Sequence, residues 1–358
     1  MMTIGILGGG QLGLMMAQSA KKLNHKIVVL DPNLHCPCAS IADLHLCAAY
    51  DDKKAFKHFV DLCDVCTYEF ENADATLVAQ FESKFPQGSK ALAISSHRFI
   101  EKNFAKECGL TTPDFFLIEK ESDLSKISSF PVIIKTCRFG YDGKGQWLVR
   151  SDAQLSQLKL NFPQEYIVES LIAWSHEISV IVARSHDGIV TFPPFENNHH
   201  HGILSLTLCP STVLESLQKQ ALKQAQTLIE ALDYYGVLAV EFFIKDDQLI
   251  FNEFAPRPHN SGHCTIECFT HSQFDVHVAA ITKARMSQPI QVHHGMMVNI
   301  LGQHYDYAYS LYKSLNHPQL TFHDYGKKEH ALNRKVAHIT STITDKSLLI
   351  QFIQGEDQ

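Results

Sequence analysis

The first hundred residues of the chain alternate short apolar runs with amphipathic stretches. Strands are predicted at residues 4–7, 26–30, 64–68 and 91–94. Between them, apolar side chains recur every three or four positions, which is typical of helices with one buried face. Strands that alternate with helices form a parallel sheet with helices packed on its faces. The N-terminal part is therefore predicted to be an α/β domain built on a parallel sheet.

A glycine-rich turn, residues 8–13, joins the first strand to the first helix. It reads Gly-Gly-Gly-Gln-Leu-Gly, and Asp31 follows about twenty residues later at the end of the second strand. This context fits a dinucleotide site, although the positive N-terminus of a helix can hold any phosphate. A nicotinamide dinucleotide, another phosphate ligand and a purely structural turn all remain open. The rest of the chain favours another phosphate ligand.

A second glycine-rich segment, residues 138–146, follows an apolar run that ends at Lys135. It contains three glycines and Lys144. Glycines allow close approach of the backbone and lysines neutralise phosphate charge, so this cationic hairpin can fold over a triphosphate. Tyr141 and Trp147 are bulky for a loop that only turns, which argues against an ordinary solvent loop.

Two acidic residues are predicted to face each other across the hairpin formed by residues 237–254. If its turn holds three residues, 246–248, Glu241 lies directly opposite Glu253. Like charges in that position repel each other, so the pair indicates a bound cation. A turn of two residues would place Glu253 on the other face. The flanking apolar residues indicate a mostly buried hairpin, which argues against a solvated pair of surface acids.

A polar segment follows this hairpin directly. It contains Arg257, His259 and the run Asn-Ser-Gly-His at 260–263. An arginine and two histidines beside a metal carboxylate are typical of an anion pocket, and less so of a polar surface loop. Together with the glycine-rich segment and the carboxylate pair, this pocket predicts an enzyme that uses ATP.

The remaining patterns divide the chain into three predicted domains. A helix is expected at 98–108 and stopped by Gly109, and three short apolar runs at 132–135, 146–149 and 166–169 indicate a small α+β lid. A hairpin signature at 185–188 precedes a long helix at 214–232. We expect an N-terminal domain at 1–97, a central domain at 98–287 with its lid at about 110–173, and a separate smaller unit at 288–358.

Composition excludes several classes of function. The 358 residues include 38 acidic and 31 basic side chains, a net charge of −7 without runs of one sign, so neither nucleic acid nor a membrane surface is an expected partner. No apolar run reaches the roughly 18 residues of a membrane span, and no signal peptide precedes the first strand. A cytoplasmic protein with a small-molecule partner is predicted.

The cysteines and histidines give no convincing metal site. The ten cysteines of such a chain are expected to be reduced thiols. Cys63 and Cys66 match C-x-x-C, but no second pair lies at zinc-ribbon spacing, so buried thiols are preferred over a metal or redox role. The three histidines at 199–201 cannot all face one metal in a regular strand or helix, and a loop is predicted there.

Taken together, these segments resemble the ATP-grasp superfamily and, within it, the N5-carboxyaminoimidazole ribonucleotide synthases of purine biosynthesis. The similarity covers nearly the whole chain and rests on segments 8–13, 31–32, 68–72, 140–146, 252–263 and 334–335, which follow the order of that family. The resemblance implies an ATP-grasp fold of mixed α/β and α+β type. It consists of a Rossmann-like parallel-sheet domain, a small lid domain, and a C-terminal domain that packs on the ATP-grasp domain. It also implies a homodimer.

The resemblance further implies roles for individual residues. Lys135, Arg257 and His259 would be catalytic, the last two by holding bicarbonate, while Glu241 and Glu253 would bind Mg²⁺. ATP would be bound by Arg98, Lys135, Gly140, Tyr141, Asp142, Gly143, Lys144, Gly145, Gln146, Glu169, Ser170, Leu171, Ile172, Glu177, His199, Asn252 and Glu253. The aminoimidazole ribonucleotide would be bound by Gln11, Leu12, Glu69, Tyr141, Lys144, Asn299, Lys328 and Arg334, so that the N-terminal glycine-rich turn serves the substrate.

The implied reaction is the ATP-dependent carboxylation of 5-aminoimidazole ribonucleotide. Bicarbonate would attack the γ-phosphoryl group, and the carboxyphosphate formed would release carbon dioxide beside the exocyclic amine. The products would be N5-carboxyaminoimidazole ribonucleotide, ADP and phosphate. One departure concerns residues 331–335, which read Ala-Leu-Asn-Arg-Lys where relatives tend to have Arg-Pro-Gly-Arg-Lys. With one cation absent, a lower substrate affinity is expected.

Three other functions are compatible with parts of the pattern. A nicotinamide dehydrogenase would use the N-terminal turn, and a non-catalytic metal binder would use cysteines and histidines. Another ATP-grasp ligase, such as the formate-using glycinamide ribonucleotide transformylase or a biotin carboxylase, would share the central segments. The segments 68–72 and 259–263 favour the N5-carboxyaminoimidazole ribonucleotide synthases.

Overall fold

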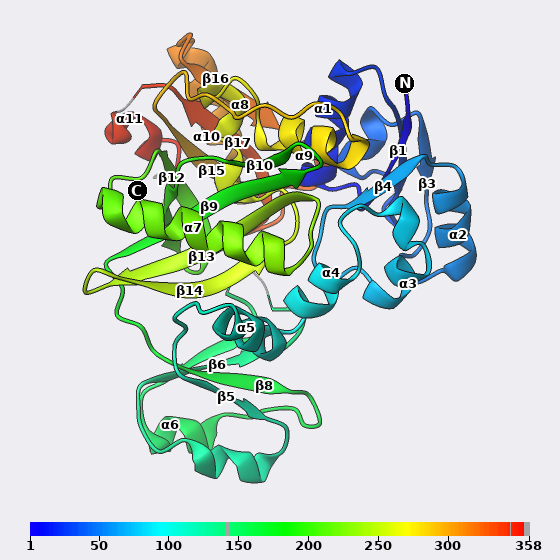
Figure 1. Ribbon diagram of the computed structural model, residues 1–358. Coiled ribbons are helices and arrows are strands. Elements are labelled where there is room, and N and C mark those ends of the chain that lie inside the picture. Colours follow the sequence, from blue (N-terminus) through cyan, green and yellow to red (C-terminus); the bar gives the residue numbers. More distant parts are fainter. Residues whose placement is uncertain (141–142, 344, 354–358) are drawn as a thin grey trace.

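Three sheets organise the computed structural model of the chain, which describes residues 1–140, 143–343 and 345–353 (Figure 1). A parallel sheet of four strands belongs to the N-terminal part, and a sheet of nine strands forms the centre. A second four-stranded sheet lies apart from both, at the bottom of Figure 1. None of the described helices is long and apolar enough to cross a membrane.

The parallel sheet confirms the fold predicted for the first hundred residues. Its strands stand in the order β3-β2-β1-β4, and every pairing is parallel. The first helix follows the glycine-rich turn directly and packs on the sheet through a common apolar core. The bounds are β1 Thr3–Leu7, α1 Gln11–Lys22, β2 Lys26–Leu30, β3 Leu44–Leu46, α2 Lys53–Asp61, β4 Val65–Tyr68 and α3 Ala75–Gln80.

Residues 91–94 are helical, so the strand predicted there is wrong. They belong to α4 (Lys90–Ser95), and β3 supplies the fourth strand of the sheet. A short apolar run suits a buried strand and a short helix equally well, so its period cannot decide between them. Ala91 and Leu92 are buried while Ala93 is exposed, which is the one-sided burial of a helix that lies on a core.

The small antiparallel sheet is the predicted lid. Its order is β5-β8-β6-β7, and the three apolar runs expected there are confirmed as strands. The glycine-rich segment joins β6 to β7, which pair as an antiparallel hairpin. The bounds are α5 Arg98–Glu107, β5 Phe115–Ile118, β6 Val132–Thr136, β7 Gln146–Val149, α6 Asp152–Gln157 and β8 Tyr166–Ser170. Gly109, with φ +85°, ends α5 as expected.

The large sheet runs through both the central part and the tail of the chain. Its order is β14-β13-β9-β11-β12-β15-β17-β16, with β10 paired to β9. The tail was expected to be a separate unit, but β15 pairs with β12, so its strands extend the central sheet. The strands are β9 His176–Ser185, β10 Gly188–Thr191, β11 Phe195–His200, β12 Ile203–Cys209, β13 Gly236–Lys245, β14 Gln248–Ala255, β15 Gly295–Leu301, β16 Leu320–Asp324 and β17 Lys335–Ser341.

Two helices cover opposite faces of this sheet. α7 (Glu215–Ala231), which confirms the long helix predicted at 214–232, shares a core with Ile178 and Val180 of β9. α9 (Gln273–Thr282) shares a core with Ile181 and Ala183 on the other face. Alternate side chains of β9 thus pack into two different cores, one on each face of the sheet. α9 also contacts α1, so the parallel-sheet domain and the large sheet are joined by packed side chains.

The remaining predictions concern single segments. The hairpin at 185–188 is confirmed by the β9–β10 pairing. The loop predicted for the three histidines is wrong for His199 and His200, which end β11, and is confirmed for His201, which lies in the following turn. The ten cysteines are free thiols, and Cys63 and Cys66 are buried in the core beside α2. The other helices are α8 Thr265–Cys268, α10 Tyr305–Leu315 and α11 Lys346–Ile350, with 3₁₀ turns η1 Pro37–Ser40, η2 Glu82–Lys84, η3 Glu121–Lys126, η4 Asn260–Gly262 and η5 Gly302–His304.

Candidate active site

The hairpin of β13 and β14 places Glu241 directly opposite Glu253, as predicted. The turn that produces this register differs from the one predicted. The turn holds two residues, Asp246 and Asp247, with φ of 50° and 56°, and not three. A shift in register beside Glu241 leaves Asn252 as an extra residue on β14. This β-bulge restores the pairing that a two-residue turn would otherwise have lost.

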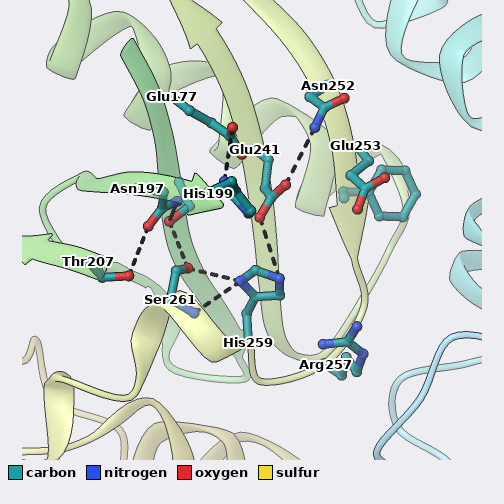
Figure 2. Close-up of polar contacts among 12 residues, drawn as sticks. Glu177, Asn197, His199, Thr207, Glu241, Asn252, Glu253, Arg257, His259 and Ser261 are labelled. Carbon is teal, nitrogen blue, oxygen red and sulfur yellow. Dashed lines mark hydrogen bonds and ion pairs between the residues drawn. The ribbon is translucent and has the colours of Figure 1, made fainter. Parts of the chain in front are cut away.

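The bulge also brings Asn252 into the site. Successive side chains of a regular strand face opposite sides of a sheet, so Asn252 and Glu253 would be separated in one. Here both line the same cavity as Glu241 (Figure 2), and Asn252 Nδ2 lies 3.5 Å from Glu241 Oε2. Two carboxyl groups and one side-chain amide, whose Nδ2 faces Glu241, therefore line one place.

The two carboxyl groups are held in different charge states. Burial, together with the nearby Glu177 and Glu253, raises the pKa of Glu241 to about 8. Burial also opposes the ionisation of Glu253, but the Arg98 guanidinium lies 2.7 Å from its Oε2 and holds the pKa of Glu253 at about 2. At neutral pH the pair therefore carries one proton, which resides on Glu241.

Arg257 and His259 flank this pair. Arg257 Nε donates to Glu71 Oε2 at 2.6 Å, and His259 Nε2 lies 3.5 Å from Glu241 Oε1. Burial and the charge of Arg257 lower the pKa of His259 to about 3, so its imidazole is neutral. A cation and a neutral N–H donor side by side can hold a small oxyanion.

A cavity of about 350 Å³ lies on one side of the pair. Ile133, Leu171 and Phe243 line its apolar end, where Trp174 stacks on Phe243 at 5.8 Å. A charged end and an apolar aromatic end together suit a nucleotide. Many of the residues predicted to bind ATP line this cavity: Arg98, Lys135, Gly143, Gln146, Glu169, Ser170, Leu171, Ile172, Glu177, His199, Asn252 and Glu253.

A buried ion cluster stands at the charged end. Lys135 Nζ donates to Glu169 Oε2 at 2.9 Å, and Lys102 Nζ lies 3.5 Å from Glu169 Oε1. Burial opposes the charge of this carboxylate, but the two ammonium groups hold the pKa of Glu169 at about 2. Lys102 also donates to the carbonyl of Asn252 at 2.8 Å, so α5 supports the bulge. Sequence reasoning missed Lys102, because a lysine in an amphipathic helix carries no signal of burial.

Arg98 connects the glycine-rich segment to the carboxylate pair. Its Nη2 donates to the carbonyl of Gly140 at 3.1 Å, while its Nη1 holds Glu253. Gly145 supports the hairpin, because its carbonyl accepts from the amide of Thr136 at 2.8 Å. The other residues of the glycine-rich segment lie in different places. Gly140 lines the larger cavity described next, and Lys144 lines a basic recess beyond it. Tyr141 and Asp142 lie outside the described residues.

A larger cavity of about 610 Å³ lies on the other side of the pair. Its lining comes from all three parts of the chain and includes Gln11, Leu12, Glu69, Arg257, His259 and Arg334. Both cavities are lined by Glu241, Glu253 and His199. His199 Nδ1 lies 3.2 Å from Glu177 Oε2, which raises its pKa although burial works against the charged ring. The carboxylate pair thus stands in a wall shared by two ligand-sized spaces.

The N-terminal glycine-rich turn holds an internal carboxylate. Glu69 accepts from the amides of Gly10 and Gly13 at 2.5 and 2.7 Å. A Cβ on Gly8, where φ is +97°, or on Gly10 would overlap the Glu69 side chain. The amides of Gly10 and Gly13 are thus occupied by an internal anion, which argues against a phosphate bound by this helix N-terminus. The dinucleotide interpretation loses its phosphate site for the same reason.

Two predicted substrate residues, Lys328 and Asn299, line neither the larger cavity nor the basic recess. Lys328 is exposed, whereas its neighbour Lys327 lines the cavity and donates to Gln11 Oε1 at 2.7 Å. Both lysines lie in the loop after β16, and the sequence of a loop does not fix which of two neighbours points inward. Asn299 is buried in β15, where its Nδ2 donates to the carbonyl of Leu204 at 2.8 Å. It is absent from the described lining of both cavities.

Sequence reasoning also missed two residues beside predicted ones. Glu71 holds Arg257, and Lys335 lines the larger cavity next to Arg334. Both lie in segments that carried the resemblance, 68–72 and 334–335. The family resemblance therefore pointed to both segments, but a segment common to a family does not by itself show which of its side chains points into the cavity.

The convergent oxygens fit a magnesium ion. Mg²⁺ in nucleotide sites takes one or two carboxylates together with substrate phosphates. Glu241 and Glu253 supply such carboxylates, and a cation would offset the burial and the neighbouring acids that raise the pKa of Glu241. Within residues 1–140, 143–343 and 345–353, no group of three or more His, Cys, Asp or Glu is arranged to hold a metal ion by itself.

The three-part fold and the two cavities that meet at a carboxylate pair define an ATP-grasp ligase. The family model of the ATP-grasp domain matches residues 103–274. Models of the ribonucleotide synthetase preATP-grasp domain and of the phosphoribosylaminoimidazole carboxylase C-terminal domain match residues 1–96 and 295–351. Within this class, the chain belongs to the N5-carboxyaminoimidazole ribonucleotide synthase family, whose members act in purine biosynthesis.

Relatives and solved structures support this assignment along the whole chain. A synthase of that name from Staphylococcus saprophyticus is 40% identical over 364 residues, which cover 98% of this chain and 96% of the relative. The structure of the Staphylococcus aureus enzyme complexed with ADP has a TM-score of 0.93 and 37% identity, and covers 98% of this chain and 97% of its own. An Aspergillus clavatus structure in complex with ADP and 5-aminoimidazole ribonucleotide has a TM-score of 0.88 and 27% identity, covering 99% and 96%.

Proposed function

We propose that the chain uses bicarbonate as its one-carbon substrate and carboxyphosphate as its intermediate. The overall reaction is that of its family, the ATP-dependent conversion of 5-aminoimidazole ribonucleotide into N5-carboxyaminoimidazole ribonucleotide. One observation carries the proposal: the carboxylate pair stands in the wall between two cavities, with Arg257 and His259 beside it. A phosphoryl group bound in one space can therefore meet a small anion at the edge of the other.

In this proposal ATP occupies the 350 Å³ cavity. Its base lies at the apolar end near Phe243, and its phosphates lie between Arg98, Lys135 and the glycine-rich segment. Ser170 to Ile172 contact the adenine side, Glu169 lies between them and Lys135, and Glu177 and His199 contact the ribose and phosphate side. The cations neutralise charge on the phosphates, which is most of what a protein contributes to phosphoryl transfer.

The aminoimidazole ribonucleotide occupies the 610 Å³ cavity. Gln11, Leu12, Glu69 and Arg334 line it, and we add Lys327 in place of Lys328. Lys144 lines the adjoining basic recess and is kept as a candidate for the phosphate end, together with Tyr141. Asn299 is no longer proposed as a direct contact, because it lies buried in the sheet.

Bicarbonate binds between Arg257 and His259. One of its oxygens attacks the γ-phosphorus and the bond from that phosphorus to ADP breaks, which gives carboxyphosphate. The carbon–oxygen bond of carboxyphosphate then breaks to release carbon dioxide and phosphate. The exocyclic amine of the ribonucleotide adds to carbon dioxide and loses one proton. Exclusion of water matters, because carboxyphosphate hydrolyses readily, and the glycine-rich segment supplies this closure.

Glu241 and Glu253, with Asn252 beside them, would hold Mg²⁺. When bound, the ion would polarise phosphoryl oxygens and neutralise their charge. The chain's own contribution is to present two carboxylates on one face of the hairpin, through the bulge at Asn252.

The test is phosphate release from ATP with each co-substrate omitted in turn. Turnover is expected only when both bicarbonate and 5-aminoimidazole ribonucleotide are present, with N5-carboxyaminoimidazole ribonucleotide as the product. Glu253→Gln should abolish magnesium-dependent turnover while leaving the far-UV circular dichroism unchanged. ATP turnover that is independent of bicarbonate would reject the proposed substrate, and full activity of Glu253→Gln would reject the metal role.

We also propose a homodimer in the cytoplasm, with sequence domains at 1–97, 98–287 and 288–358, the last of which extends the central sheet. The family resemblance supports all of these, and the family models matched at 1–96, 103–274 and 295–351 support the division into units. Sedimentation equilibrium tests the dimer, since a monomer at micromolar concentration would contradict it.

A further inference from the structure

A row of buried polar side chains leads through the sheet to His259 (Figure 2). Thr207 comes from β12, Asn197 from β11, Ser179 from β9 and Ser261 from η4. Each is 2% exposed or less, and polar groups are costly to bury unless they are hydrogen-bonded. Their arrangement therefore needs an explanation beyond chance.

Each member of the row donates to the next. Thr207 Oγ1 donates to Asn197 Oδ1 at 3.1 Å, and Asn197 Nδ2 donates to Ser179 Oγ at 3.0 Å. Ser179 Oγ then donates to Ser261 Oγ at 2.7 Å. Since Ser261 accepts that proton, its own hydroxyl proton is left to point at His259 Nδ1, 2.9 Å away.

The backbone fixes the same direction at the end of the row. The amide of Ser261 donates to His259 Nδ1 at 3.3 Å. An amide N–H can only donate, so Nδ1 is an acceptor and the ring proton sits on Nε2. That nitrogen faces Glu241 Oε1. The opposite tautomer would set an Nδ1–H against the amide N–H of Ser261, and a ring turned over would present a carbon to Ser261 and to Glu241.

We propose that Ser179 and Asn197 are positioning residues that hold His259 with its Nε2–H toward Glu241 and the bicarbonate site. Neither residue is among those that the structure shows lining the two cavities, so they act through His259. The inference rests on the proposed role of His259 in bicarbonate use. Residues that orient the groups around a metal or substrate site are often worth about 10-fold to 100-fold in activity.

The first test is a double-mutant cycle. Ser179→Ala removes the link between Asn197 and Ser261, and should lower kcat by about 10-fold while leaving the KM for ATP within about 2-fold. In a His259→Asn background, which lacks the oriented nitrogen, Ser179→Ala should cause no further loss. The same fold-loss in both backgrounds, or no loss in the wild-type background, would overturn the proposal, because the row would then serve only the stability of the sheet.

Two further variants keep the result interpretable. Asn197→Asp preserves size and still accepts from Thr207, but it cannot donate to Ser179, so it should reproduce the loss in kcat even if Ser179→Ala folds poorly. Ser185→Ala makes the same change at another buried serine of β9, one that accepts from the amide of Asp187 at the turn. It should leave kcat unchanged, and an equal loss there would overturn the proposal.

A spectroscopic test separates this inference from the proposed function. In protein labelled with ¹⁵N-histidine, His259 is identified by the signal missing from His259→Asn. It should show the Nε2–H tautomer in the wild type, and Ser179→Ala should shift its Nδ1 resonance. An unchanged Nδ1 resonance would overturn the positioning role. Failure of the wild type to use bicarbonate would instead reject the proposed function, while the spectrum would still decide whether the row orients the ring.

Discussion

The chemistry of single residues in this site is set by the charged groups packed against them. Glu241 and Glu253 are the same residue type and stand opposite each other, yet burial leaves a proton on one while Arg98 removes it from the other. The pair thus carries one negative charge, and it gains a second when a bound cation makes Glu241 ionise. A site of this kind couples nucleotide binding to the movement of a proton.

We therefore predict that binding of Mg–ADP near pH 7 releases most of one proton. The pKa of Glu241 is about 8 without a cation, and a nearby cation favours the ionised form. Calorimetric titrations in two buffers of different ionisation enthalpy measure this release. It should decline as the pH approaches 9, where the group is already ionised, and it should vanish in Glu241→Gln. Heats that do not depend on the buffer at pH 7 would contradict the assignment.

The buried ion cluster predicts a loss of stability. Glu169→Gln should lower the free energy of unfolding by about 3–5 kcal/mol at pH 7, because it leaves Lys102 and Lys135 without their carboxylate. The pKa of Glu169 in the folded state, about 2, lies below its ordinary value of 4.5. The stabilisation is therefore fully present above pH 4.5 and is lost as the pH falls towards 2. Urea unfolding of both proteins should show a difference that narrows below about pH 4. A constant difference would indicate another cause.

At the scale of elements, the site depends on irregularities in otherwise regular strands. The bulge at Asn252 corrects the register and turns a third polar side chain to the cavity, and α5 holds it through Lys102 and Glu101. Alternating patterns predicted the hairpin and the opposed acids, but such patterns do not reveal a bulge. The prediction of Glu241 opposite Glu253 was therefore confirmed although the turn length behind it was wrong. The short helix at 91–94 was not predicted for a related reason, since four residues are too few to show a helical or a strand period.

The glycine-rich hairpin of the lid gives a prediction at this scale. Gly145 has φ of +71°, and a Cβ there would lie 2.7 Å from Thr136 Oγ1. Gly145→Ala should therefore cost the closed hairpin about 1 kcal/mol, which lowers the affinity for ADP by roughly five-fold. Gly188→Ala is the matched control, because φ is also positive there (+124°) but the glycine opens β10, after the turn that joins it to β9. Equal effects of the two variants on ADP affinity would contradict this explanation.

At the scale of the whole molecule, the larger cavity exists only because three distant parts of the chain meet. Gln11 comes from α1, Arg257 follows the central hairpin, and Lys327 lies in the tail, whose strands continue the central sheet. The order of the motifs predicted this architecture. It also predicted most of the nucleotide cavity, because the residues that line that cavity fall within short segments that a sequence pattern can identify. The tail was less predictable, since its loop between β16 and β17 has no period that fixes which side chains turn inward.

The last prediction uses that loop. Lys327 Nζ donates to Gln11 Oε1 and to the carbonyl of Lys335 at 2.6 Å, so its charge joins the tail to the N-terminal domain inside the cavity. Lys327→Met should raise the KM for 5-aminoimidazole ribonucleotide by about ten-fold, the loss expected for a charged hydrogen bond of roughly 1.5 kcal/mol. Its affinity for ADP should stay unchanged, because the nucleotide lies in the other cavity.

Lys328→Met provides the comparison for this variant, because it removes the same charge from the exposed neighbouring position. Steady-state kinetics with the ribonucleotide varied should therefore separate the two substitutions by about the same ten-fold factor. If they raised this KM equally, the effect would come from the general positive field of the tail, and the inward position of Lys327 would not matter for binding. A larger effect of Lys328→Met would return the assignment to the residue first suggested by the family resemblance.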